Sequence, residues 1–331
     1  MTVSPRVSDE QLILSDHPAD TKLSAYGVIL LGGKSEHFNP PPSYTVLKGS
    51  GWDPENGVGY PDTSTLEAIE LPNQERYPLQ VRDMESPHLE GAAVIGLQSK
   101  LLPWRVVKAM WDGDAVHIKN CTGTASVSDV YFENVEDGLG PSDGLDYWKL
   151  ERAWMKDIRD DTVENDSYIS GEITNCLIDG CFVFLSTRDS SENTTPPRTI
   201  VKDCLVRISA QPHDGTEGRS FRNRYIKPRE DGVGVAPGMI FKWERNAGEV
   251  EVRDTIFYMD AVSINGVDDM IFPPGTYENV TLIWTGPGNY PGRLPQGITV
   301  IRDPSVWEKA RGDWISKLPL EHPGLNLPDL P

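Results

Sequence analysis

A repeating pattern of apolar and polar residues runs through the middle of the chain. The clearest copies are SVSDVYFENVEDG (126–138), KLERAWMKDIRDD (149–161) and EITNCLIDG (172–180), with further copies at 199–209, 250–260 and 277–286. Within each copy the apolar positions alternate with a period close to two, which indicates strands. The strands of the first three copies begin at Val127, Leu150 and Ile173, each 23 residues after the last. A repeat of this length is too short for a strand plus a helix with ordinary loops, and suits three short strands and three turns.

This period predicts an all-β fold: a single-stranded right-handed parallel β-helix, a solenoid of about 23 residues per coil. Neighbouring coils would lie about 4.8 Å apart, so that equivalent side chains stack in columns. Each copy carries a polar residue, often Asn or Asp, before a small or β-branched one. The pairs are Asp129-Val130, Asn175-Cys176, Asp203-Cys204, Asp254-Thr255 and Asn279-Val280.

Segments of different character flank and interrupt the repeat. Residues 1–75 are irregular and rich in Pro and Gly, which predicts an N-terminal cap, with Tyr26 to Leu31 as an edge strand. The β-helix would span 76–303, interrupted at 210–238 by a polar, Arg-rich insertion. An insertion of this kind is either part of a binding face or a variable loop, and the sequence leaves both readings open.

Residues 304–331 are expected to form a short C-terminal helix and a tail. Asp303 and Pro304 fit an N-cap and a first helical position. Val306, Ala310 and Trp314 then share one face, which predicts that the helix plugs or flanks the last coil.

Charge and composition limit the classes of partner that this protein is expected to bind. The net charge of −19 argues against a nucleic-acid partner, which would need a basic surface. No apolar run is long enough to span a membrane, so no membrane partner is expected. Met1 to Ser15 does not read as a signal peptide, so the protein is either intracellular or secreted after removal of a leader. The cysteines Cys121, Cys176, Cys181 and Cys204 are too few for a disulfide scaffold, and free buried thiols are favoured over a disulfide.

Acidic residues gather in RDDTVENDSY (159–168), which contains Asp160, Asp161, Glu164 and Asp166. The 23-residue register places Asp160 over Asp137 and Asp137 over Asp114. Such a column needs protonation, turn amides, a basic partner or a cation to offset repulsion. Capping of turn amides alone is an equally weighted reading.

Alternation along this strand leaves its outward side open. Val163 argues that Asp160, Glu164 and Asp166 point outward, whereas a column of Val116, Leu139 and Thr162 argues the reverse. For a cation, calcium is the natural candidate, with Asp137, Asp160 and Asp166 as ligands.

Basic, aromatic and imidazole groups complete the candidate chemistry. Arg188 ends the strand CFVFLSTR and Lys242 lies in MIFKW, and either could neutralise a substrate carboxylate or act as a base. For each of them, a plain surface residue is the competing reading. Candidates for sugar binding are Trp148, Tyr168, His213 and Trp243. His117 is a further acid–base candidate by residue type, and no zinc, dinucleotide or P-loop pattern is present.

The phrases DAVHIKNCTG (114–123), VYFENVEDG (130–138) and ITNCLIDG (173–180) carry a family resemblance. From about Gly113 to Val300 the chain resembles the pectate-lyase-like parallel β-helix superfamily of polysaccharide lyases, polygalacturonase-type hydrolases, epimerases and phage tailspikes. The chain lacks the vWiDH-like and RxPxxR-like segments of pectate lyases and the NTD, GHG and RIK set of polygalacturonases. Only the pair Asp160-Asp161 is similar to the adjacent aspartates of the hydrolases. The resemblance therefore implies the fold and an uncharacterised branch, and it assigns no catalytic residues.

These observations favour a carbohydrate-active enzyme with a polysaccharide substrate. β-Elimination of a uronate-containing glycan, with Asp160, Asp161, Glu164, Arg188 and Lys242 as catalytic residues, is the leading prediction. A glycoside hydrolase with a carboxyl pair from Asp160, Asp161 and Glu164 is the first alternative. A non-catalytic glycan-binding β-helix, trimeric if tailspike-like, is the second.

Overall fold

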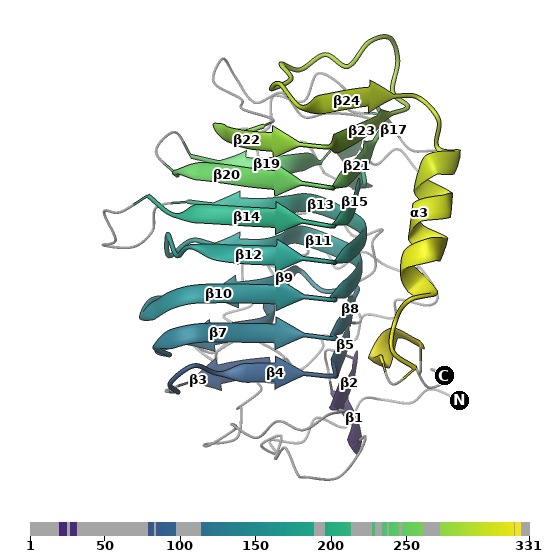
Figure 1. Ribbon diagram of the computed structural model, residues 1–331. Coiled ribbons are helices and arrows are strands. Elements are labelled where there is room, and N and C mark those ends of the chain that lie inside the picture. The colour runs from purple at the N-terminus through teal and green to yellow at the C-terminus, as the bar shows by residue number, and fades with distance from the viewer. Residues whose placement is uncertain are drawn as a thin grey trace, which may run out of the picture.

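The computed structural model describes residues 20–24, 27–31, 79–82, 84–96, 114–188, 196–212, 227–228, 234–236, 238–244, 247–260, 272–320 and 322–325. These residues form an all-β architecture in which the repeat copies pair in parallel (Figure 1). The expectation of an all-β chain with parallel strands is confirmed.

Seven strands make a parallel sheet that faces the viewer in Figure 1, and we call it the front sheet. Its strands are β4 (His88–Glu90), β7 (Gly123–Ser128), β10 (Leu145–Glu151), β12 (Gly171–Thr174), β14 (Arg198–Lys202), β20 (Glu249–Arg253) and β22 (Gly275–Glu278). Val127 pairs with Leu150, and Leu150 pairs with Ile173. The 23-residue register predicted these pairs, and it is confirmed here.

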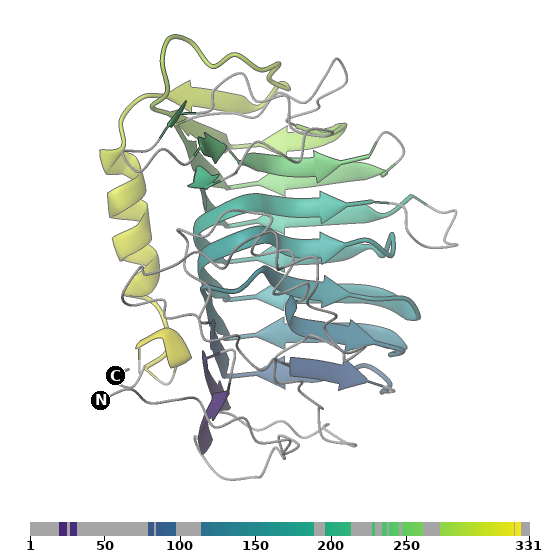
Figure 2. The same cartoon turned by 180° about the vertical axis from the view of Figure 1, so that it is seen from behind.

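A second sheet has fourteen strands, and we call it the bent sheet. Two of its strands are long: β11 (Trp154–Asn165) and β13 (Leu177–Thr187). The start of β11 pairs with β8 and its end with β9, while the start of β13 pairs with β15 and its end with β19. The register shifts between Ile158 and Asp161, and again between Asp179 and Cys181. The long strands therefore turn a corner, visible from behind in Figure 2, and divide the bent sheet into two faces.

The first face of the bent sheet contains β5 (Ala92–Gly96), β8 (Tyr131–Glu133), β15 (Leu205–Ile208), β21 (Ile256–Met259), β23 (Val280–Trp284), β24 (Ile298–Ile301) and the starts of β11 and β13. The second face contains β3 (Leu79–Arg82), β6 (Asp114–Lys119), β9 (Asp137–Pro141), β19 (Met239–Trp243) and the ends of β11 and β13.

Two short pieces differ from the parallel pattern. β1 (Asp20–Ser24) and β2 (Gly27–Leu31) extend the first face at β5 in antiparallel order. The predicted edge strand is thus a strand from Gly27 onward, but β1 takes the edge position. Within the insertion, β16 (Gln211–Pro212), β17 (Lys227–Pro228) and β18 (Gly234–Ala236) form a small antiparallel sheet. The remaining parts of the cap and the insertion lie outside the described residues.

A column of left-handed residues links the front sheet to the first face. It consists of Asp129, Arg152, Asn175, Asp203, Asp254 and Asn279, with φ between 48° and 55°. Asn and Asp tolerate this conformation better than other residues with a Cβ, which explains the polar position of every copy. The next residue of each copy, such as Val130 or Cys176, is buried. Each copy thereby turns sharply while keeping an apolar residue in the core.

The core lies between the two sheets and is filled by stacked apolar side chains. All four cysteines are buried and free, which confirms the expectation of unpaired thiols. Cys176 and Cys204 follow the aligned residues Thr174 and Lys202, so they occupy the same position of neighbouring copies.

The C-terminal helix α3 (Ser305–Ile315) lies along the first face, beside several repeat copies (Figure 1). It buries Trp307 and Trp314 against Leu177, Leu205 and Ile283, and Val306 and Ala310 pack on the same cluster. The predicted apolar face is confirmed, and the helix flanks the stack. The helix begins at Ser305, so Pro304 holds the N-cap position predicted for Asp303. Asp303 still accepts a hydrogen bond from the Ser305 amide (2.9 Å).

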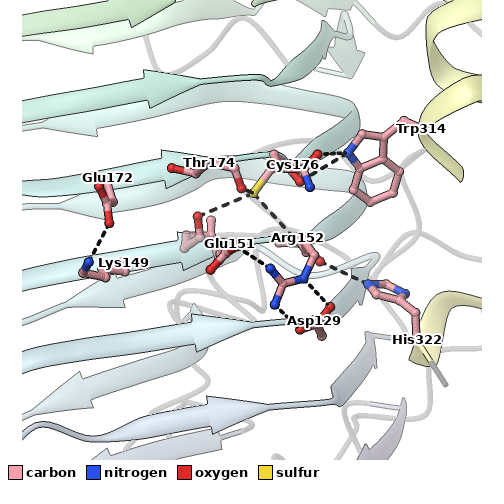
Figure 3. Close-up of polar contacts among 12 residues, drawn as sticks. Asp129, Lys149, Glu151, Arg152, Glu172, Thr174, Cys176, Trp314 and His322 are labelled. Atoms are coloured by element: carbon pink, nitrogen blue, oxygen red, sulfur yellow. Dashed lines mark hydrogen bonds and ion pairs between the residues drawn. The ribbon is translucent and has the colours of Figure 1, made fainter. Parts of the chain in front are cut away.

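The last turn of α3 and the segment after it are fixed to the left-handed column, as Figure 3 shows. Trp314 Nε1 donates to Asn175 Oδ1 (3.0 Å). Arg152, the one column member that is neither Asn nor Asp, donates two hydrogen bonds to Asp129 (2.8 and 2.7 Å). The buried His322, just before the 3₁₀ turn η1 (Pro323–Leu325), donates from Nε2 to the Arg152 carbonyl (3.1 Å) and accepts from the Gly324 amide at Nδ1 (3.1 Å). Burial lowers the pKa of His322, which favours the neutral ring that this pattern needs.

Replacement of Asn175 separates the two contributions of this column. We expect Asn175→Ala to lower the free energy of unfolding by about 2 kcal/mol, because it adds left-handed strain to the loss of the Trp314 hydrogen bond. Asn175→Gly loses the hydrogen bond but relieves the backbone strain, so it should cost about 1 kcal/mol. Urea unfolding of both variants measures the difference. Equal losses for the two variants would contradict a strained turn.

Candidate functional site

A column of side chains on the outer side of the second face marks the candidate site. In register it contains His117, Gly140, Glu164, Ser186 and Lys242. The neighbouring column, Val116, Leu139, Val163, Leu185 and Phe241, belongs to the hydrophobic core. Since side chains alternate along a strand, the first column points away from the core. This answers the question of sidedness: Val163 points inward and Glu164 outward.

The predicted stacking of aspartates is confirmed between Asp114 and Asp137 and is wrong between Asp137 and Asp160. Asp114 pairs with Asp137, as expected. Beyond the corner of β11, however, Leu139 pairs with Val163 and not with Thr162. The extra residue at the corner shifts the register by one, so Asp161 takes the place expected for Asp160. Its amide donates to Asp137 Oδ1 (2.7 Å), which is the amide-capping role considered above.

The floor of the site is a buried ion cluster. Lys242 Nζ lies 2.6 Å from Asp161 Oδ2 and 3.9 Å from Asp160 Oδ2. Asp161 is fully buried, and Asp160 and Asp137 are nearly so. One carboxylate oxygen from each of Asp137, Asp160 and Asp161 lies within 4.8 Å of the others. The sequence could not pair Lys242 with these acids, because 81 residues separate it from Asp161.

The mouth of the site is more open. Arg188 lies 3.4 Å from Glu164 through Nη2 and 3.4 Å from Asp166 through Nε. The side chains of Glu164, Asp166 and Arg188 are 28%, 33% and 40% exposed. The structure therefore brings the predicted catalytic residues together in two layers, with Asp160, Asp161 and Lys242 beneath Glu164 and Arg188.

A second acid–base element lies next to Glu164. His117 Nδ1 contacts Asp114 Oδ2 at 2.7 Å, and Asp114, Asp137 and Glu164 each offer an oxygen within 4.8 Å of the others. Gly140 separates His117 from Glu164 in the column, and a Cβ there would lie 2.1 Å from Asp114 Oδ2. Glycine thus makes room for the Asp114 carboxylate. The sequence suggested His117 only by residue type, since residues i and i+3 of a strand are not expected to meet.

Burial and mutual repulsion raise the pKa of several carboxyl groups. Burial, then Asp161, Asp114 and Asp166, raise the pKa of Glu164 to about 9. Burial and Asp160 raise the pKa of Asp161 to about 7, although Lys242 opposes them. Burial and Glu164 raise the pKa of Asp137 well above its ordinary value. Glu164 is therefore protonated at neutral pH while its side chain is still accessible.

The two bases of the site are held as cations. Burial alone would lower the pKa of Lys242, but Asp160 and Asp161 outweigh it, so that its pKa lies above the ordinary value. The pKa of Arg188 is likewise raised by Asp166, Asp161 and Glu164 against the effect of burial. Neither side chain is suited to accept a proton, which leaves neutralisation of carboxylates as their role.

The predicted calcium ligands are only partly assembled. Asp137 and Asp160 lie in one carboxylate group, whereas Asp166 pairs with Arg188. The Lys242 ammonium already contacts two acids of that group, so it occupies the electrostatic place of a cation there. The group of Asp114, Asp137 and Glu164 fits a divalent ion better by ligand type, since calcium prefers several carboxylate oxygens. Calcium binding stays a prediction.

The predicted sugar-binding aromatics do not meet at this site. Trp148 is fully buried and donates from Nε1 to the Ile169 carbonyl (3.0 Å), so it presents no ring face to a sugar. Tyr168 is also buried. Trp243 packs against the core and against Phe241. The burial of Trp148 and Tyr168 corrects the prediction of sugar stacking for these two residues. Trp243 is partly buried, and its contact with a sugar stays a prediction. His213 lies outside the described residues.

Comparison of the chain with protein families, curated proteins and solved structures finds no match in any of the three. In the part of the chain that the structure describes, none of the helices is both long and apolar enough to cross a membrane. The functional argument therefore depends on the site itself.

The role of Lys242 can be tested through stability. We expect Lys242→Met to lower the free energy of unfolding, by about 3–5 kcal/mol at pH 9, because a buried carboxylate loses its partner. The loss should be smaller at pH 5, where Asp161 is protonated and needs no cation. Urea unfolding at both pH values checks this, with Lys149→Met as control, because that variant removes only exposed contacts, to Glu172 and to the Tyr147 ring. An equal loss at the two pH values would argue against the buried ion pair.

Proposed function

We propose that the strands form a single-stranded right-handed parallel β-helix of the pectate-lyase-like type. The chain visits the front sheet, the first face and the second face in turn, and its strands pair in parallel with those of the next copy. Parallel crossover connections are overwhelmingly right-handed, which supports the handedness. The side-chain columns along such a stack present an elongated outer face, which suits a polymer.

We propose further that the protein cleaves a glycan at the second face by acid–base catalysis. The observation that carries the proposal is an accessible Glu164, whose pKa burial and neighbouring acids raise to about 9, beside an imidazole held by a carboxylate. Glu164 donates its proton to the glycosidic oxygen as that bond breaks. His117, oriented by Asp114, accepts a proton from the water whose oxygen bonds to the anomeric carbon. Glu164 loses one proton and His117 gains one, so the site returns to its starting state once a proton passes from His117 to Glu164 through solvent.

Hydrolysis fits this site better than elimination. Elimination from a uronate needs a base for the carbon-bound proton and a surplus of positive charge for the substrate carboxylate. Lys242 and Arg188 are engaged by four acids and stay protonated. The fully buried Asp161 is also out of reach of a polymer, so it positions Lys242 and is not a nucleophile. Of the carboxyl groups predicted to act as a pair, Glu164 keeps a direct chemical role.

Activity of a Glu164→Gln variant tests the proposal. The wild-type chain is incubated with neutral, amino and uronic polysaccharides, and reducing ends and unsaturated products are both measured. We expect reducing ends without unsaturated products, and a fall in kcat of about 10²–10⁴-fold in Glu164→Gln, because the proton donor is lost. The alkaline limb of the wild-type kcat profile should lie near pH 9. Glu172→Gln, an acid of the front sheet, serves as control.

Unsaturated products would favour elimination instead. Affinity for a glycan without either product would favour a non-catalytic, tailspike-like β-helix, for which a trimer in solution is the expected state. If the chain neither binds nor cleaves any of these polysaccharides, the proposed function is refuted.

A further inference from the structure

Resting on the proposed function, we propose that the glycan cleaved at this site carries free amino groups, and that a protonated sugar amine binds between Glu164, Asp166 and Ser186. The substrate class is thus an amino glycan and not the uronate expected from the sequence. The inference follows from the balance of charge at the site and from one polar group that the protein leaves without a partner.

The site contains more acids than bases among the described residues. The acids are Asp114, Glu136, Asp137, Asp160, Asp161, Glu164 and Asp166, and the basic groups are His117, Arg159, Arg188 and Lys242. Lys242 is committed to the floor and lies mostly out of solvent. At the mouth, Arg188 pairs with both Glu164 and Asp166. An incoming cation has two accessible carboxyl groups to contact, whereas an incoming carboxylate is repelled by those acids of the site that are ionised.

Ser186 supplies an independent sign that a polar group belongs here. It lies in register between Glu164 and Lys242 on the outer column, and it is fully buried. Its Oγ atom has no hydrogen-bond partner. Buried hydroxyl groups are nearly always bonded, because an unmet one costs free energy. A ligand ammonium that donates to Oγ beside Glu164 would satisfy it.

The raised pKa values of the acids also favour an ammonium over a carboxylate as the ligand. Burial and neighbouring acids raise the pKa of Glu164 to about 9 and that of Asp137 well above its ordinary value, so the electrostatic field inside the site is negative. An ammonium that pairs with Asp166 and donates to the carbonyl oxygen of the protonated Glu164 offsets this field and leaves the proton donor in place, while a bound uronate would add to the repulsion. Attraction between the chain, with its net charge of −19, and a polycation also favours encounter.

Two substrates that differ only at nitrogen provide the test. The kcat/KM of the full chain is measured at pH 6 with a glucosamine hexamer and with its fully N-acetylated counterpart. We expect a preference of about tenfold or more for the amine, since charge-assisted hydrogen bonds are stronger than neutral ones. The preference should shrink as salt is raised. Asp166→Asn and Ser186→Ala should each reduce it about threefold or more, while Glu172→Gln leaves it unchanged.

The outcomes separate this inference from the proposed function. Equal or better cleavage of the acetylated hexamer, or of an oligogalacturonate, overturns the amino-glycan inference and leaves hydrolysis standing. Without turnover on any substrate the proposed function fails, and titration calorimetry with the two hexamers then decides on binding alone. Tighter binding of the amine that Asp166→Asn weakens supports the amine site. The amine site is overturned if the two hexamers bind equally. It is also overturned if millimolar calcium chloride displaces the amine and Ser186→Ala has no effect on amine binding.

Discussion

Parallel pairing of equivalent strands is the constraint on which the rest of this structure depends. Because each copy of the repeat bonds to the next in register, residues at one position of the repeat must lie beside their counterparts. At the left-handed column this stacking is tolerated, since Asn and Asp suit the backbone, Asn279 donates to Asp254, and Asn175 accepts from Trp314 of α3. On the second face the same constraint brings carboxyl groups together that would otherwise repel.

The electrostatic properties of the site follow from that crowding. Asp114 and Asp137 are stacked by register, and the corner of β11 adds Asp160 and Asp161. Two responses offset the repulsion within the cluster: the raised pKa values of Glu164 and Asp137, and the cations Lys242 and Arg188. The second response draws residues from β13 and β19, which are distant in sequence but adjacent in the sheet. The crowding that the fold imposes thus raises the pKa of an accessible carboxyl group, Glu164.

The sequence predicted what depends on period, and failed where the period breaks. The pairs Val127–Leu150, Leu150–Ile173 and Asp114–Asp137 were all readable from a 23-residue spacing. The shift at the corner of β11 was not, because an added residue at a turn leaves no mark in the apolar pattern. Nor could alternation reveal that Trp148 is buried, since a tryptophan is as consistent with packing as with sugar binding. The contact of Lys242 with Asp161 needed the order of strands in the second face.

The central claim is that Glu164 is a protonated, accessible acid at neutral pH. Carbon-13 NMR of the side-chain carboxyl groups measures this directly, with the Glu164 resonance assigned by comparison with Glu164→Gln and followed from pH 4 to pH 10.5. The account predicts a midpoint near 9. A midpoint close to 4.5, the ordinary value for glutamate, would contradict it, since Glu164 would then be ionised at neutral pH and unable to protonate a leaving group.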